Sequence, residues 1–147
     1  MANEVPERVV VERVLPASPA EVYEAWTSRE TLARFLCPGD MTATVVEVDV
    51  RIGGRFVVVM HDGDRHLEHR GEYRVLEPGR RLVFTWASPP TSWQETLVTV
   101  ELTPQEDGTR LVLIHEGLST DDVRGRHRRG WTSIVEKLTR YLRKETA

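Results

Sequence analysis

The chain has 147 residues, of which 39% are hydrophobic and 29% are charged. This composition is typical of one globular domain spanning residues 1–147, and it excludes a disordered or fibrous chain. The formal net charge is only −3, which disfavours nucleic-acid binding, because nucleic-acid-binding domains are usually basic as a whole.

The apolar runs, the N-terminal residues and the cysteine content indicate the cellular compartment of the protein. No apolar run approaches the roughly 20 residues that a membrane-spanning helix needs. The N-terminal residues show no basic segment followed by an apolar one, so we expect no secretory signal. The single cysteine, Cys37, cannot form an internal disulfide, which favours a reducing compartment. We therefore expect a cytoplasmic protein without membrane contact.

Charge is distributed unevenly along the chain. Residues 1–120 contain 12 basic and 19 acidic residues, whereas residues 121–147 contain 8 basic and 4 acidic residues. The second segment includes the cluster Arg124, Arg126, Arg128 and Arg129. The cluster fits a solvated helix face, and the alternative is a surface that docks on an acidic partner.

The first 40 residues predict a strand followed by two short helices. Residues 8–15 are rich in β-branched side chains, which favour a strand. Ser18 and Glu21 have the spacing of a capping box at a helix start. Ser28 is the expected cap of a second helix, which the sequence Cys-Pro-Gly at 37–39 ends.

The middle of the chain has the short period of a β-sheet. The six expected strands cover residues 44–50, 55–61, 66–76, 82–86, 93–102 and 109–116. Short turns containing glycine or proline separate them, as in the hairpin expected at 62–65. Strands joined by such short turns must be antiparallel neighbours.

The C-terminal segment predicts one long helix over residues 121–143. Ser119 and Asp122 have the spacing of a capping box, and the apolar side chains form one stripe. That stripe consists of Trp131, Ile134, Val135, Leu138, Tyr141 and Leu142. A helix of this length spans roughly 34 Å, about the length of a ten-residue strand, so it can cross one face of the sheet.

Several segments of the sequence also resemble those of a known family. Segments such as GGRFVVVM, GEYRVLEPGRRLVFTW and GWTSIVEKLTRYL are similar to those of activator of heat-shock protein 90 ATPase homologues, in the START-like (SRPBCC, helix-grip) superfamily. The resemblance covers nearly the whole chain. It implies an α+β helix-grip fold: a curved seven-stranded antiparallel sheet, two short helices after the first strand, and a long C-terminal helix packed across one face.

The resemblance also implies a cavity between the sheet and the long helix. Related folds hold lipids, sterols, polyketides or plant hormones there. The eukaryotic protein that names the family acts on a chaperone through an additional domain, which we do not expect in a chain of this length. From the resemblance we expect a small, largely apolar ligand, and the alternative partners are a chaperone and a second copy of this chain.

Strand alternation indicates which side chains face the long helix. The inward set is Phe56, Val58, Met60, Leu67, His69, Gly71, Tyr73, Val75, Leu82, Phe84, Trp86, Leu111, Leu113 and His115. From these faces and from the helix we predict a ligand-binding set of Phe56, Val58, Met60, His69, Tyr73, Phe84, Trp86, Leu113, His115, Trp131 and Val135. The alternative is that the same side chains simply fill the core.

The inward histidines are the candidates for polar chemistry. His69 and His115 can bond a ligand carbonyl, or they are core histidines satisfied by the backbone. The same two alternatives apply to His127, on the apolar side of the long helix. An enzyme of the cyclase or dehydratase kind would use either one as a general base, with Tyr73 as a hydrogen-bond donor. Glu95 is expected on the outer face with Trp93, so it is not a candidate acid.

A metal site is not expected. His61 and His66 flank the predicted hairpin near two aspartates, but His69 points to the opposite face from His66. Two imidazoles at an exposed hairpin end more commonly have no metal. No catalytic motif or cofactor-binding motif is present, and we expect no cofactor.

The long helix carries one further signal. Gly125 and Gly130 both lie near its start, where each glycine costs about 1 kcal/mol relative to alanine. We therefore predict that residues 121–130 open to admit a ligand, with Trp131 at the inner edge of the opening. The alternative is that the glycines permit close packing against the preceding loop.

Overall fold

The N-terminal third of the chain forms one strand and two capped helices. In the computed structural model, which describes residues 8–146, β1 spans Arg8–Leu15, α1 spans Pro19–Thr27 and α2 spans Arg29–Phe35. Ser18 and Glu21 form the expected capping box, with the Ser18 hydroxyl accepting a bond of 3.2 Å from the Glu21 N–H. Ser28 caps α2 as predicted.

Six further strands follow and complete one antiparallel sheet. They are β2 (Thr42–Val48), β3 (Arg55–Asp62), β4 (Arg65–Glu77), β5 (Arg81–Trp86), β6 (Thr96–Gln105) and β7 (Gly108–Glu116). The strand order is β1-β7-β6-β5-β4-β3-β2, so consecutive strands of the meander are neighbours and β1 pairs with the last strand. This confirms the predicted seven-stranded α+β fold.

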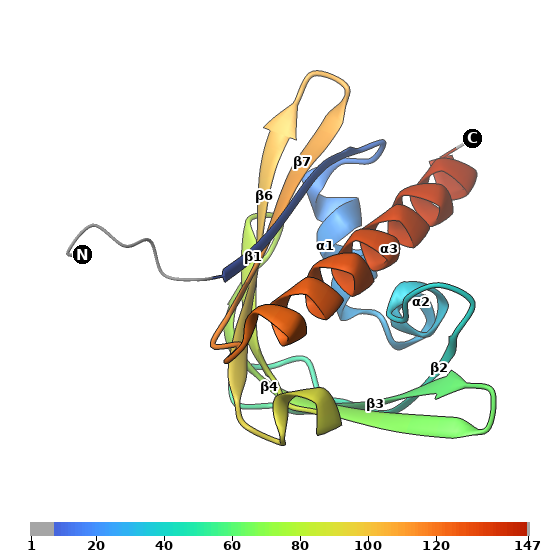
Figure 1. The fold of residues 1–147 in the computed structure, drawn as a ribbon. Helices are drawn as coiled ribbons and strands as arrows, with labels where there is room; N and C mark the ends of the chain where they lie inside the picture. The colour runs from blue at the N-terminus through green and yellow to red at the C-terminus, as the bar shows by residue number, and fades with distance from the viewer. Residues whose placement is uncertain (1–7, 147) are drawn as a thin grey trace.

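The sheet is strongly curved around the helices. Figure 1 shows β6 and β7 in one limb and β2 and β3 in the other, with α3 crossing the concave side and α1 and α2 on that same side. The curve requires a close approach at Gly71, where a Cβ atom would lie 2.2 Å from both the Phe56 ring and the Thr85 carbonyl oxygen. Any side chain at this position would therefore force the sheet to change shape.

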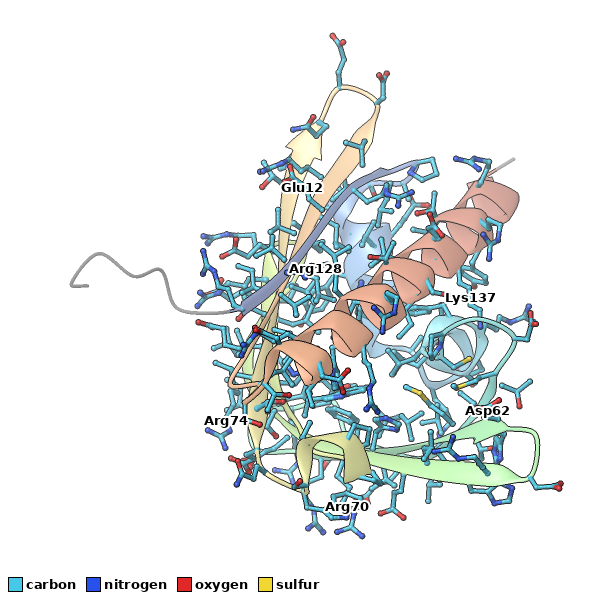
Figure 2. The ribbon with its side chains drawn as sticks, viewed as in Figure 1. Glu12, Asp62, Arg70, Arg74, Arg128 and Lys137 are labelled. Atoms are coloured by element: carbon cyan, nitrogen blue, oxygen red, sulfur yellow. The ribbon has the colours of Figure 1, made fainter. Side chains whose placement is uncertain are left out.

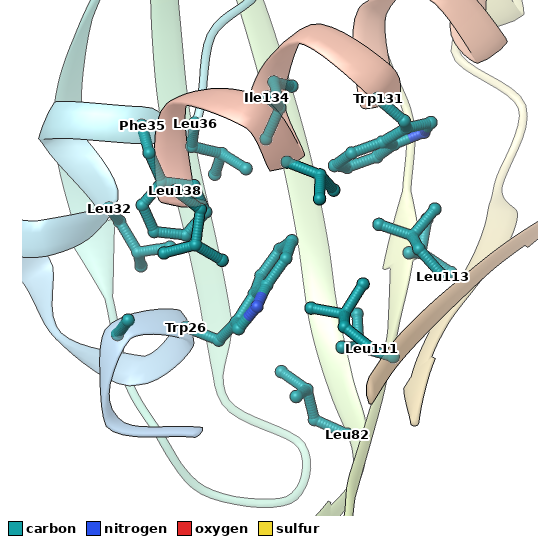
Figure 3. Packing of buried hydrophobic residues seen from close by; sticks show 14 of the residues in the cluster. Trp26, Leu32, Phe35, Leu36, Leu82, Leu111, Leu113, Trp131, Ile134 and Leu138 are labelled. Carbon is teal, nitrogen blue, oxygen red and sulfur yellow. The ribbon is translucent and has the colours of Figure 1, made fainter. Parts of the chain in front are cut away.

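The long helix α3 spans Asp121–Thr146 and covers the core. The predicted stripe lies against the sheet, with Trp131, Ile134, Val135, Leu138 and Leu142 all buried. Figure 3 shows Trp131, Ile134 and Leu138 projecting from this helix and Trp26 of α1 filling the space between the helices and the strands. None of the helices within residues 8–146 is long and apolar enough to cross a membrane.

The strand predicted at residues 44–50 lies at Thr42–Val48, and other element ends shift by up to three residues. Three further details differ from the sequence-based predictions. The helix cap is Thr120 rather than Ser119, since the Thr120 hydroxyl accepts a bond of 3.1 Å from the Val123 N–H. A bulge between Tyr73 and Val75 turns Val75 away from the inward face, because one extra residue reverses the alternation. Leu76 takes that inward place and pairs with Leu82.

The third difference is at the start of β6, which we predicted at residue 93. A short 3₁₀ helix, η1 (Pro89–Thr91), precedes it, and Ser92 and Trp93 follow in left-handed backbone conformations with φ of 56° and 61°. The strand therefore begins only at Thr96. Trp93 lies 46% exposed outside the strand, with the Arg70 guanidinium 4.8 Å from its ring centroid.

Candidate functional site

A cavity lies where the first half of α3 faces the sheet. It has a volume of about 140 Å³, and we call it the α3 cavity. Its walls come from the loop after α2, from β3, β4 and β5, from η1 and from α3. The lining residues are Pro38, Met41, Met60, Leu67, His69, Trp86, Pro90, Arg126, His127, Gly130, Trp131 and Ile134.

Two tryptophans form the inner wall of this cavity. The Trp86 and Trp131 ring centroids are 5.0 Å apart, and the His69 ring lies 4.9 Å from Trp86. Each tryptophan is 2% exposed and His69 is 6% exposed. Arg126, in contrast, is exposed and pairs with Asp122 at 2.7 Å. The cavity therefore runs from a charged rim to an aromatic floor.

The floor is held by a chain of hydrogen bonds, which we call the indole relay. The Trp131 indole N–H donates to His115 Nδ1 at 2.9 Å. His115 Nε2 lies 2.7 Å from the Thr96 hydroxyl, which lies 2.6 Å from the Trp86 carbonyl oxygen. An indole N–H can only donate and a carbonyl can only accept. His115 Nε2–H must then donate to Thr96, and the Thr96 hydroxyl must donate to Trp86.

The relay fixes the chemistry of His115. Both ring nitrogens are occupied, and burial, helped by the nearby His127, lowers the pKa of His115 to about 3. A general base needs a free lone pair and a pKa near the working pH. His115 has neither, so it is a structural link between α3 and the sheet, satisfied by side chains rather than by the backbone.

His69 and His127 differ from His115 because they line the cavity. His69 Nδ1 lies 3.0 Å from the Leu67 carbonyl oxygen, and His127 Nδ1 lies 2.9 Å from the Val123 carbonyl oxygen. Each Nδ1 therefore carries the proton and donates it, which leaves Nε2 as an acceptor in the neutral ring. Burial lowers the pKa of His69 to about 4 and also lowers the pKa of His127.

The structure divides the predicted ligand-binding set into three groups. Met60, His69, Trp86 and Trp131 line the α3 cavity. Phe56, Tyr73 and Phe84 line a separate small cavity of about 10 Å³, together with Trp26, Leu32 and Leu36. Val58, Leu113, His115 and Val135 are fully buried in the core and line neither of these two cavities.

Several lining residues were not in the predicted set. Leu67 was on the predicted inward face and Ile134 on the predicted helix stripe, so the periodicity contained the signal for both. Pro38 and Met41 come from the loop after α2, and Pro90 comes from the short helix η1, in a segment predicted as a loop. Strand and helix periodicity gives no information about where such loops lie in space.

The groups of the general-base hypothesis are separated. His69 lines the α3 cavity, whereas Tyr73 lines the small cavity and His115 is occupied by the relay. Burial raises the pKa of the Tyr73 hydroxyl well above its usual value. Glu95 is exposed and pairs with Arg74 at 3.3 Å, and Figure 2 shows Arg74 on the side of the sheet away from α3.

The two histidines of the β3–β4 hairpin face each other. The His61 and His66 ring centroids are 4.8 Å apart, and His61 Nε2 lies 2.9 Å from the Thr44 hydroxyl. Within residues 8–146, no group of three or more histidine, cysteine, aspartate or glutamate side chains is placed to hold a metal ion.

The arginine cluster of α3 is only partly on the surface. Arg124 is largely buried, with a 13% exposed side chain, and donates to the Leu118 carbonyl oxygen at 2.7 Å. Arg128 and Arg129 are exposed. Arg124 thus holds the start of α3 to the loop before it.

Comparison with solved structures places this architecture among proteins of known fold. A structure from Chromobacterium violaceum superimposes with a TM-score of 0.86 at 26% identity, over 94% of this chain and 98% of that one. An AHSA1 protein from Silicibacter pomeroyi gives a TM-score of 0.80 at 26% identity, over 95% and 99%. An AHSA1-like protein from Aeromonas hydrophila has the same fold, with a TM-score of 0.77 at 21% identity, over 95% and 94%.

The sequence itself gives the family. None of the curated proteins compared with this chain matches it. Residues 16–143 match the family model described as Activator of Hsp90 ATPase homolog 1-like protein, which covers all elements from α1 to most of α3. This chain therefore belongs to the Activator of Hsp90 ATPase homolog 1-like family, in the START-like superfamily.

Proposed function

We propose that this protein binds a small, largely apolar molecule in the α3 cavity, without turning it over. The observation that carries the proposal is the cavity itself: an apolar space with an aromatic floor and a few polar groups, which is the usual form of a small-molecule site. The single cysteine, Cys37, has a free thiol, which supports a reducing, cytoplasmic setting for this role.

The volume of the cavity supports a small ligand. An engineered apolar cavity of about 150 Å³ is known to bind benzene, and the α3 cavity has about 140 Å³. One six-membered ring therefore matches the space. A fatty acid, sterol or aromatic polyketide would need the first turns of α3 to move outward.

We propose binding rather than catalysis because the reactive groups do not converge. Of the three groups in the cyclase or dehydratase hypothesis, only His69 lines the α3 cavity, and the donor Tyr73 lines the other cavity. Burial lowers the pKa of His69 to about 4 and also lowers the pKa of His127, which makes both rings weak proton acceptors near neutral pH.

Ligand titrations followed by tryptophan fluorescence and by melting temperature test the proposal. Toluene is a suitable first probe, because Trp86 and Trp131 line the cavity. A ligand present at 100 times its dissociation constant adds about 2.7 kcal/mol to the free energy of unfolding. Fatty acids, sterols and aromatic polyketides extend the series to larger molecules.

A matched pair of variants at Gly130 locates the binding. A Cβ atom at this position would meet only Pro38, at an ordinary contact distance of 4.0 Å, so Gly130→Ala leaves the cavity nearly unchanged. Gly130→Leu extends a side chain beside Pro38 and fills the space. Both should favour the helix, but only Gly130→Leu should abolish toluene binding. Absence of binding by the unchanged protein, or equal binding by both variants, contradicts the proposal.

A further inference from the structure

The two imidazoles that line the α3 cavity, His69 and His127, can act as hydrogen-bond acceptors. His69 and His127 each turn Nδ1 back to a carbonyl oxygen of their own element, at 3.0 and 2.9 Å. The backbone of Val58 also contacts the His69 ring. Because both rings line the cavity, the opposite edge of each imidazole, which carries Nε2, is the part that can meet a ligand. A neutral imidazole with its proton on Nδ1 presents a lone pair at Nε2. The cavity thus offers two acceptors for ligand donors.

Both imidazoles lie where the charged form is disfavoured. His69 is 6% exposed with its ring against Trp86, and His127 packs its ring 5.0 Å from His115. Desolvation lowers the pKa of both groups, and the proximity of His127 lowers that of His69 further. Near neutral pH these rings therefore accept hydrogen bonds and do not offer a positive charge to an anion.

The remaining cation lies at the rim. Among the described residues that line the cavity, Arg126 is the only arginine or lysine. Its side chain is 62% exposed and pairs with Asp122 at 2.7 Å. A carboxylate placed against the aromatic floor would lose its hydration without gaining a buried counter-ion, which is strongly unfavourable. A neutral ligand with an O–H or N–H donor meets no such penalty.

We propose that the α3 cavity selects single-ring phenols, whose hydroxyl group donates to Nε2 of His69 or His127 while the ring packs against Trp86 and Trp131. This inference rests on the proposed binding function and names its ligand class. The volume of the cavity fits a ligand with one ring. The two tryptophans favour an aromatic ring, and the two acceptors favour a ligand that carries a hydrogen-bond donor.

Three compounds of similar size test the selection: phenol, toluene and benzoate. Their dissociation constants are measured by isothermal titration calorimetry near neutral pH. The ratio of the phenol constant to the toluene constant separates the hydrogen bond from ring burial. In His69→Phe or His127→Phe this ratio should rise about tenfold, as expected from the loss of one net hydrogen bond. Benzoate should bind more weakly than phenol to the unchanged protein.

The control variant is His66→Phe. His66 lies on the same strand as His69 but is exposed on the other face, so the change should leave the ratio within twofold (about 0.4 kcal/mol). Toluene binding by each cavity variant shows that the variant is folded and that its cavity persists.

Nitrogen-15 NMR of the unchanged protein tests the same contact without any substitution. The Nε2 resonance of His69 or His127 should move when phenol is added, and it should move much less with toluene. Toluene binding with an unchanged phenol-to-toluene ratio in both variants and unmoved Nε2 resonances overturns the phenol inference alone. Failure of all three compounds to bind overturns the proposed function as well.

Discussion

At the scale of single residues, the most informative side chain is that of His115, which the sequence predicted as a candidate general base. His115 links Trp131 of α3 to Thr96 of β6, and both of its nitrogens are used. The sequence indicates that His115 points inward, which is confirmed. The sequence does not indicate what meets it there, because Thr96 and Trp131 come from distant parts of the chain.

Removing the hydroxyl of Thr96 should destabilise the fold. Thr96→Val leaves the His115 Nε2–H without an acceptor in a buried site, and an unsatisfied buried donor costs about 1–3 kcal/mol. The free energy of unfolding, measured in urea, should fall by this amount. Thr99→Val is the matched control, because Thr99 lies on the same strand and is only half-buried. Equal stability of the two variants would show that the relay contributes nothing.

At the scale of elements, strand alternation predicted the inward faces well until a strand became irregular. The faces of β3, β5 and β7 follow the predicted alternation, with Phe56, Leu82 and Leu113 all buried. The bulge after Tyr73 then shifts the last part of β4. A bulge is set by how two strands twist against each other, so a single strand's own sequence does not show it.

The α3 cavity was partly predictable for the same reason. Its floor comes from regular elements, such as Trp86 of β5 and Trp131 of α3. Part of its wall comes from Pro38 and Met41, in the loop after α2, and from Pro90 of the short helix η1. Their positions depend on how far the sheet curves, and that curvature is a property of the assembled sheet rather than of any one segment.

The start of α3 is the element whose motion we predict. Residues 121–130 contain two glycines and lie over the cavity, while Trp131 is fixed by the relay. Amide exchange should therefore be faster at 121–130 than at 134–142 in the absence of ligand. Similar exchange rates in both segments would disprove an opening helix start.

One substitution links this motion to ligand entry. A Cβ atom at Gly125 would lie 3.6 Å from the Arg129 guanidinium, which is an ordinary contact, so Gly125→Ala should stiffen the helix by about 1 kcal/mol. The association rate of toluene, measured by stopped-flow fluorescence, should then decrease. If the variant shows slower amide exchange but an unchanged association rate, ligand entry does not depend on opening of the helix start.

At the scale of the whole molecule, the buried histidines make stability depend on pH. His69 and His115 have folded-state pKa values of about 4 and about 3, against 6.5 in the unfolded chain. The unfolded chain therefore binds more protons below about pH 6.5, and stability falls as the pH falls. The His127 ring lies 5.0 Å from that of His115. Burial lowers the pKa of His127, and the charge of Arg126 lowers it further, so His127 acts in the same direction.

The expected loss of stability is measurable above the pH range in which carboxylates titrate. From pH 6.5 to about pH 5, each of the two histidines should remove about 1.6 kcal/mol from the free energy of unfolding, because the slope approaches 1.36 kcal/mol per pH unit only once the unfolded histidine is mostly protonated. Urea unfolding at several pH values gives this slope. His66→Gln should leave the slope unchanged, because His66 is exposed. A flat profile would show that the buried rings are protonated in the folded state.

The indole relay also determines how rigid the cavity is before any molecule enters it. The Trp131 indole is linked, through the side chains of His115 and Thr96, to the backbone carbonyl of Trp86. The entropy of ordering this floor is therefore lost when the chain folds and not when a ligand arrives. Binding to such a preorganised surface retains more of its gross interaction energy, so even a molecule with few atoms can be held there.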